Sequence, residues 1–249
     1  MALNSELVRL AHGDGWQELG RLFEGRGGGT AAHRGVRLMA SGLLHPQWNS
    51  GDVMAADVDL EAARAFYAAR RVPWGLRVPC EIPWRRGRLV LHQRLMGLVP
   101  SAFRHAEPPE WFHFETATEA DLEAVGAVDA VAFRSDRDSA RPWFAALLAA
   151  PPDVVTVVRA VADGRTVGTG YSVFARGLAG ASGYVAGIAV LPAYRRRGCA
   201  TALSSWLVHR AFSAGAELVH LHPDDDRAAR LYAKLGFVET SGLDIYVDL

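Results

Sequence analysis

The chain has 249 residues, of which 50% are hydrophobic, with 27 basic and 27 acidic residues. This length and apolar content allow one large hydrophobic core or two small ones, so we expect one or two globular domains. A formal net charge of zero excludes the overall basic footprint that is typical of proteins binding nucleic acid or anionic membranes.

The sequence has two cysteines, Cys80 and Cys199, without CxxC spacing. This count does not fit a disulfide framework or a zinc ribbon. The N-terminal segment lacks the features of a signal peptide, and no stretch approaches the ~20 apolar residues that a membrane helix needs. We therefore expect a cytoplasmic protein with no metal and no membrane contact.

In the first hundred residues, the glycine-rich composition of residues 23–35 predicts a loop, and residues 36–44 predict a strand. Asp59 is the expected cap of a helix that begins after it and ends before Pro73. The segment His45 to Asn49, together with Trp74 and Trp84, suggests a surface that faces a substrate. Burial of these aromatic residues beneath a small α+β unit is an equally good interpretation.

A proline-bearing stretch at residues 104–111 predicts a linker, so we place a domain boundary near residue 108. Beyond it the patterns predict an α+β unit of alternating strands and helices. In chain order we expect a strand at 113–116, a helix opened by Thr118 and Asp121, a short helix over 142–150 started by Pro142, a hairpin turning at Asp163 and Gly164, a strand at 185–190, a helix at 199–212, a strand at 217–222, a helix at 224–235 and a closing strand at 241–249.

The segment YRRRGCATAL, residues 194–203, joins a predicted strand to a predicted helix. A helix N-terminus offers unpaired backbone N–H groups and partial positive charge, and Gly198 permits close approach to the backbone. The segment lacks the glycine patterns of nucleoside triphosphate and dinucleotide sites. It therefore predicts a local phosphate-binding turn, with a solvated run of arginines as the alternative.

Two segments together, IAVLPAYRRRGCATAL and DDDRAARLYAKLGF, resemble the acetyl-CoA-binding core of the GNAT superfamily of N-acetyltransferases. The first meets the signature Q/R-x-x-G-x-G/A at Arg195, Gly198 and Ala200. The second meets the pattern N-x-x-A-x-x-L-Y-x-x-x-G-F, with Asp225 where asparagine is usual, at Ala228, Leu231, Tyr232, Gly236 and Phe237. The resemblance covers about residues 110–249. It implies a mixed, mostly antiparallel central sheet flanked by helices.

The resemblance also implies acetyl-CoA as co-substrate. Its pyrophosphate would be held by the backbone N–H groups between Arg196 and Thr201, and its pantetheine arm would pair with the strand edge at Ile188 to Val190. The cofactor-binding residues implied in this way are Ile188, Ala189, Val190, Arg195, Arg196, Arg197, Gly198, Cys199, Ala200, Thr201, Asp225 and Ala228.

Two residues are catalytic candidates. Tyr232 matches the position from which a phenol often protonates the departing thiolate in this superfamily, and its ordinary pKa of ~10 lies close to that of a thiol. The alternative is a core aromatic residue on the apolar face of its helix. His222 is the candidate base because histidine titrates in the useful range, although a structural role fits equally. Cys199 is not expected to act as a nucleophile, since it lies on the apolar face of its helix.

Aligning Tyr67 with Tyr232 superposes the helix that follows Asp59 on the last helix of the chain, which suggests a duplicated unit. The first half has no counterpart of the Arg195, Gly198 and Ala200 signature. We therefore predict a smaller, degenerate GNAT-like α/β domain over residues 1–108 and an acetyl-CoA-binding domain over residues 109–249.

Two hypotheses of function follow. The first is an enzyme that moves acetyl from acetyl-CoA to a primary amine of a small molecule or peptide, by direct attack in a ternary complex. The second is a catalytically degenerate acyl-CoA-binding sensor. Nucleic-acid binding through the arginine run is not expected, because the C-terminal half is net acidic. The identity of the acceptor and the presence of a homodimer stay open.

Overall fold

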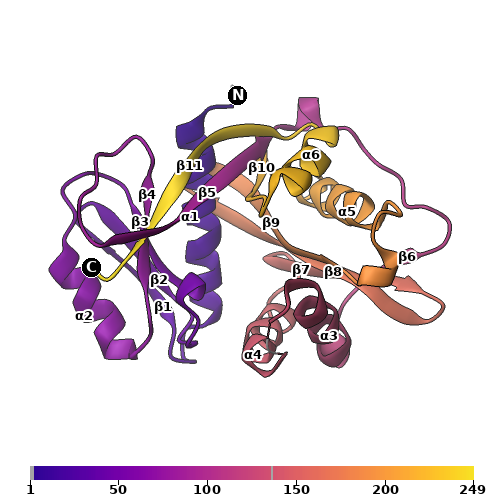
Figure 1. Ribbon diagram of the computed structural model, residues 1–249, viewed down its shortest axis with the longest axis horizontal. Helices are drawn as coiled ribbons and strands as arrows, with labels where there is room; N and C mark the ends of the chain where they lie inside the picture. Colours follow the sequence, from indigo (N-terminus) through magenta and orange to yellow (C-terminus); the bar gives the residue numbers. More distant parts are fainter. Residues whose placement is uncertain (1–2, 136) are drawn as a thin grey trace.

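The computed structural model of the protein describes residues 3–135 and 137–249 (Figure 1). Within this part of the chain the strands form one eleven-stranded sheet, in the order β1-β2-β3-β4-β11-β5-β10-β9-β8-β7-β6. The first half contributes β1 (Gly29–His33), β2 (Val36–Ala40), β3 (Asn49–Val53), β4 (Gly75–Pro79) and β5 (Arg88–Leu98). The second half contributes β6 (His113–Thr116), β7 (Val155–Ala162), β8 (Arg165–Gly177), β9 (Gly180–Val190), β10 (Leu218–Leu221) and β11 (Val238–Val247).

Helices cover both faces of this sheet. One core lies beneath α5 (Cys199–Ser213) and α6 (Asp226–Lys234), and another joins the opposite face to α1 (Ser5–Leu22), α3 (Leu122–Phe133) and α4 (Arg137–Leu148). The first-half strands pack against α2 (Leu60–Arg70), at the outer end of the molecule in Figure 1. The mixed, mostly antiparallel sheet with flanking helices confirms the predicted fold class.

The two halves exchange strands. After β10 and α6, β11 crosses over to pair with β4, while β5, which follows β4, pairs with β10. The two exchanged strands also pair with each other, so hydrogen bonds run without a break across the middle of the sheet (Figure 1). The division into two domains at residue 108 stays a prediction; the sheet itself is continuous.

The topology shows a repeat, but not the one that the aligned tyrosines indicated. In the first half an antiparallel β1-β2-β3 meander leads through α2 to β4, which is parallel to β3. In the second half β7-β8-β9 leads through α5 to β10, which is parallel to β9. Helix α2 therefore takes the place of α5 and not of α6. The alignment was misleading because an acidic cap and an apolar helix face are local features that many helices share.

Most of the predicted elements are confirmed, including the caps of two helices. Asp59 accepts a hydrogen bond from the Ala62 amide at 3.0 Å, and Asp121 accepts one from the Thr118 amide at 2.9 Å. The prediction for Pro142 was wrong, because α4 begins at Arg137 and holds Pro142 in its interior. Residues 23–35 are not all loop, since β1 lies within them as an edge strand paired only with β2.

Helix α1 carries no clear sequence signal because three glycines interrupt it. Each glycine lies where another chain segment approaches the helix: a Cβ would lie 2.0 Å from Arg37 Nη2 at Gly13, 3.1 Å from Tyr184 Cβ at Gly15 and 2.6 Å from Thr30 Cγ2 at Gly20. The glycines lower the intrinsic helix propensity of α1, but they allow it to pack closely against strands of both halves. It joins the two halves on the face opposite α5.

Two glycines that follow helices offer a matched test of packing at the exchanged strand. Gly215 and Gly236 have φ of +92° and +99°, but a Cβ at Gly236 would lie 2.0 Å from the Ala102 carbonyl oxygen, whereas nothing lies within 4 Å at Gly215. We expect Gly215→Ala to cost about 1 kcal/mol of unfolding free energy through backbone strain. Gly236→Ala should cost at least about 2 kcal/mol more, because backbone must move. Urea unfolding measures the unfolding free energy of both variants. Equal losses in the two variants would contradict the close contact between Gly236 and Ala102.

Candidate active site

The site is built on a divergence between two parallel strands. β9 and β10 pair only from Leu218 with Ser182 to His220 with Tyr184, after which β9 continues to Val190 without a partner on that side. A bulge in β9 opposite β8 increases the divergence, with Gly187 at φ +63° and a Cβ there only 2.6 Å from the Tyr171 ring. Backbone groups at this edge are therefore free to bind an extended ligand.

The N-terminus of α5 lies just beyond the end of β9. Gly198 is its N-cap at φ +86°, and no side chain caps the helix. The first N–H groups of the helix therefore have no intrahelical partner and point toward the loop, where Arg196 is also left-handed at φ +61°. By contrast, the Asp59 carboxylate caps α2 at the corresponding place in the first half. Of these two helices, α5 keeps an open, positively polarised N-terminus and α2 does not.

The three arginines that precede Gly198 have different environments. Arg195 is exposed, and its guanidinium donates to the carbonyl oxygens of Val190 at 2.9 Å and Ala132 at 3.4 Å. The Arg197 guanidinium lies 4.3 Å from the centre of the Trp111 ring. Arg196 is exposed and lines the cavity described below. Arg195 thus braces the loop against α3, and Arg196 is the arginine placed to meet an anion.

A cavity of about 760 Å³ lies where these elements meet. Its wall brings together most of the residues predicted from the sequence, although they come from β9, α5, α6 and the turn after β10. The predicted residues that line it are Ile188, Val190, Arg195, Arg196, Gly198, Cys199, Ala200, Thr201, His222, Asp225, Ala228 and Tyr232. Ala189 is buried in the sheet and Arg197 faces Trp111, so the side chains of these two lie away from the cavity wall that the described residues define.

His222 follows β10 and lies beside Tyr184 of β9. Its Nδ1 is 3.1 Å from Tyr184 Oη, and its ring centre is 5.9 Å from that of His12. Burial lowers the pKa of His222, while the nearby Asp224 carboxylate acts in the opposite direction. The imidazole is therefore neutral near pH 7. Its neighbour His220 is fully buried, and burial lowers the pKa of His220 to about 3, which gives it a structural place in the core.

Tyr232 lies on the buried face of α6 and also reaches the cavity. Burial, reinforced by the negative charges of Asp224 and Asp225, raises the pKa of the Tyr232 phenol. The phenol therefore keeps its proton at neutral pH. Tyr232 is also a core aromatic residue, because its ring packs against Phe237 with centres 5.9 Å apart. The position is therefore compatible with both the proton-donor role and the structural role. Burial raises the pKa of the Cys199 thiol to about 12, so this thiol is not a nucleophile at neutral pH.

Several residues of the cavity wall were not predicted from the sequence, and one of them is a buried acid. Asp129 projects from α3, and burial raises the pKa of its carboxyl to about 6. Among the described residues it has no hydrogen-bond or ion-pair partner, and Tyr171 is the titratable neighbour whose pKa its charge raises. The sequence signal was an acid within the apolar run AVGAVDAVAF, at a position where a helix buries its face.

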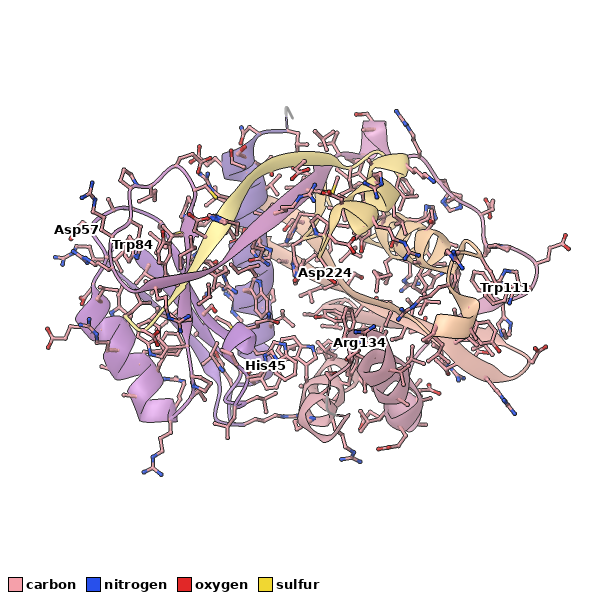
Figure 2. The ribbon with its side chains drawn as sticks, in the orientation of Figure 1. His45, Asp57, Trp84, Trp111, Arg134 and Asp224 are labelled. Carbon is pink, nitrogen blue, oxygen red and sulfur yellow. The ribbon has the colours of Figure 1, made fainter. Side chains whose placement is uncertain are left out.

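The first half also contributes to the cavity. His45, Gln47 and Trp48 line it from the segment around the short 3-10 helix η1 (Pro46–Trp48). Figure 2 shows His45 and Asp224 reaching the middle of the molecule from the two halves, with Trp84 at the outer edge. The hypothesis of a substrate-facing surface therefore gains support for His45 to Trp48. Trp74 and Trp84 pack against the outer core of the first half instead.

Comparisons with known proteins agree with this geometry. Residues 107–237, more than half of the chain, match the family model of the Acetyltransferase (GNAT) family. The chain therefore belongs to this family, and membership implies acyl-CoA-dependent acyl transfer. No curated protein sequence gives a match.

Solved structures share the fold over nearly the whole chain. A GCN5-related N-acetyltransferase from Kribbella flavida is 20% identical, with a TM-score of 0.68 over 95% of this chain and 96% of that one. A putative GNAT-family acetyltransferase from Novosphingobium aromaticivorans is 16% identical, with a TM-score of 0.62 over 96% of each chain. A protein of unknown function from Staphylococcus epidermidis is 11% identical, with a TM-score of 0.65 over 88% of this chain and 93% of that one. At these identities the likeness concerns the fold alone.

Two kinds of feature are absent from the part of the chain that the structure describes. Between residues 3 and 249, leaving out 136, no helix is both long and apolar enough to cross a membrane. In the same part of the chain no three histidine, cysteine, aspartate or glutamate side chains are grouped so that they could hold a metal ion.

The raised pKa of the Asp129 carboxyl leads to a prediction about stability. Its pKa is about 6 in the folded protein against an ordinary 3.8, so the folded state binds the proton more tightly and stability falls as pH rises between these values. Asp129→Asn removes this cost and should raise the unfolding free energy by about 2 kcal/mol at about pH 8, with the gain vanishing near pH 4. Urea unfolding at the two pH values measures the effect. The exposed Asp57, changed to asparagine, is the control, and a pH-independent effect of Asp129→Asn would contradict the assignment.

Proposed function

We propose that the protein transfers the acetyl group of acetyl-CoA to a primary amine, by direct attack while both substrates are bound. The observation that carries the proposal is the single cavity that joins the open N-terminus of α5, the unpaired edge of β9, Tyr232 and His222. The second hypothesis, a sensor without turnover, gains no support from a site that keeps both catalytic candidates on its wall. We also propose a cytoplasmic location, because both cysteines are free thiols, as is usual in a reducing compartment.

The residues present fit the chemistry of coenzyme A. The uncapped N–H groups from Cys199 to Thr201 and the guanidinium of Arg196 would hold the pyrophosphate, since both favour anionic oxygen. The free backbone groups of β9 from Ile188 to Val190 would pair with the amides of the pantetheine arm as an added strand does. As co-substrate, acetyl-CoA supplies an acetyl group activated as a thioester.

His222 is the proposed proton acceptor. An amine is an ammonium ion near neutral pH and must lose a proton before its nitrogen can attack. Burial keeps the His222 imidazole neutral, and donation from Nδ1–H to Tyr184 Oη would leave Nε2 free to accept that proton. Tyr184 would then act as a positioning residue, because it fixes the tautomer.

Tyr232 is the proposed acid. Attack of the amine nitrogen on the acetyl carbonyl carbon forms the C–N bond, and the C–S bond breaks with its electron pair remaining on sulfur. The Tyr232 phenol gives its proton to that sulfur and regains one from the nitrogen, so each turnover yields an amide, a thiol and one proton released through His222. The raised pKa of Tyr232 keeps the phenol protonated before the transfer. It also makes the phenol a weaker acid than usual, so the proton that the phenol regains from the nitrogen must accompany its donation to sulfur.

Gly198→Glu tests the cofactor site. The new side chain would be held at a left-handed backbone position and would bring negative charge to the end of the helix that should receive phosphate, so calorimetric titration should show at least a hundredfold loss of acetyl-CoA affinity. Gly215→Glu, at the other end of α5 with a similar φ of +92°, is the matched control and should bind normally. No binding of acetyl-CoA by the unchanged protein would refute the proposal.

Substitution of the two catalytic candidates tests their roles. Tyr232→Phe and His222→Gln should each leave acetyl-CoA affinity unchanged and lower kcat by about a hundredfold, the ordinary contribution of a general acid or base. Thiol release over a panel of primary amines gives the rate, and calorimetry gives the affinity. A kcat within twofold of the unchanged protein would remove the corresponding residue from the mechanism.

A further inference from the structure

The cavity has two ends that differ in charge. Near α5 its wall includes the guanidinium groups of Arg195 and Arg196. The opposite end is lined from η1, α3, α4 and β8 by His45, Gln47, Trp48, Asp129, Phe133, Ser135, Ala140, Trp143, Phe144 and Tyr171. Ala132 lies between the two ends, where its carbonyl oxygen accepts from the Arg195 guanidinium at 3.4 Å. Phosphate groups suit the first end, whereas the second end offers the Asp129 carboxylate to a cation.

The Asp129 carboxylate has no partner among the described residues, although Tyr171 lies close enough for their charges to interact. The Tyr171 hydroxyl is itself engaged by the Trp143 side chain. A half-buried carboxylate without a partner costs stability, and such groups are retained where a ligand supplies the missing charge.

Aromatic rings make up much of the wall beside Asp129, and they form a column that crosses the seam between the two halves. The ring centres of His45 and Trp48 are 4.3 Å apart, those of Trp48 and Trp143 are 4.7 Å apart, and those of Trp143 and Phe23 are 5.4 Å apart, all in stacked geometry. A rigid aromatic wall of this kind favours a flat apolar group on the ligand.

The segment that carries His45 and Trp48 is held in place by a buried asparagine. Asn49 Oδ1 accepts from the Ser41 amide at 3.0 Å, and Nδ2 donates to the carbonyl oxygens of Leu43 at 2.8 Å and His45 at 2.9 Å. Asn49 is fully buried at the start of β3. The first half therefore presents these rings to the cavity in a fixed position, as a preorganised binding surface does.

Resting on the proposed function, we propose that this end of the cavity binds the acceptor, and that the acceptor is a monocationic amine whose carbon skeleton carries an aromatic ring. Asp129 pairs with the ammonium group, while Trp48 and His45 contact the ring. A carboxylate beside the ammonium group of the acceptor would be brought next to the Asp129 carboxylate, and like charges repel, so free amino acids are disfavoured. The first half of the chain, which lacks a cofactor site, thus supplies part of the acceptor site.

Three probe amines test this specificity. 2-Phenylethylamine should have a KM at least about tenfold below that of propylamine, since a buried phenyl ring contributes that much or more to binding. Phenylalanine, which adds a carboxylate to the same skeleton, should be at least about tenfold poorer than 2-phenylethylamine in kcat/KM. Equal KM values for 2-phenylethylamine and propylamine would overturn the proposal while leaving acetyl transfer intact.

Substitutions at the cavity wall give a second readout that does not depend on turnover. Calorimetric titration of 2-phenylethylamine into protein loaded with coenzyme A should show a Kd raised at least about tenfold in both Asp129→Asn and Trp48→Ala. Trp48→Ala should change the KM of propylamine by less than about twofold, because propylamine has no ring to lose contact. Asp57→Asn and Trp84→Ala are the matched controls, far from the cavity at the edge of the molecule (Figure 2), and should behave like the unchanged protein.

The outcomes separate this inference from the proposed function. Loss of acetyl-CoA binding in the unchanged protein would overturn both. Normal acetyl-CoA binding with an unchanged Kd for 2-phenylethylamine in Asp129→Asn or Trp48→Ala would overturn the acceptor site alone. Asparagine is isosteric with aspartate, and Trp48 is partly exposed, so at least one of the two variants is expected to fold.

Discussion

The divergence of β9 and β10 is the constraint on which the site depends. Two parallel strands that paired along their whole length would satisfy every backbone group between them and leave no room for a ligand. Here pairing stops at His220 with Tyr184, and the bulge at Gly187 turns the rest of β9 away. The same separation leaves strand-edge groups free, places the N-terminus of α5 at the end of the opening, and allows Tyr232 of α6 to reach the space. The proposed binding edge, anion site and proton donor are thus consequences of one local geometry.

The two halves of the chain share a topology but differ in chemistry. Each contains a meander, a helix and a parallel strand, and the exchange of β5 and β11 joins the two into one sheet. In the first half the Asp59 carboxylate occupies the helix end where Gly198 leaves α5 uncapped in the second. One side chain is enough to convert an anion site into an ordinary capped helix. In the first half the N-terminus of α2 is capped, and the segment with His45 and Trp48 lines the shared cavity instead.

A connected set of buried polar and aromatic side chains holds the halves together beside the site. Arg77 of β4 pairs with Asp52 of β3 at 2.7 Å, and the ring of Trp16 from α1 lies 4.6 Å from the Arg77 guanidinium. Trp16 in turn donates to His12 Nε2 at 3.0 Å, and His12 packs against Tyr184 of β9. Such buried groups are costly to separate, because a lone charge would remain without its partner. They fix the position of Tyr184, on which the orientation of His222 depends.

The sequence by itself determined the local elements of the second half and indicated which segment forms the proposed cofactor end. Caps, turn residues and apolar periodicity are short-range features, and the Arg195 to Ala200 signature lies within six consecutive residues, so both can be recognised without a fold. Only the tertiary structure decided the rest. Helix α1 was missed because its glycines serve contacts with distant strands, and α2 was matched to the wrong helix because strand pairing is not encoded in a helix pattern. Sequence patterns did not single out Asp129, which packing places in the cavity beside Tyr171. The acceptor end joins residues more than eighty positions apart, and sequence spacing does not specify which of them the exchanged sheet brings together.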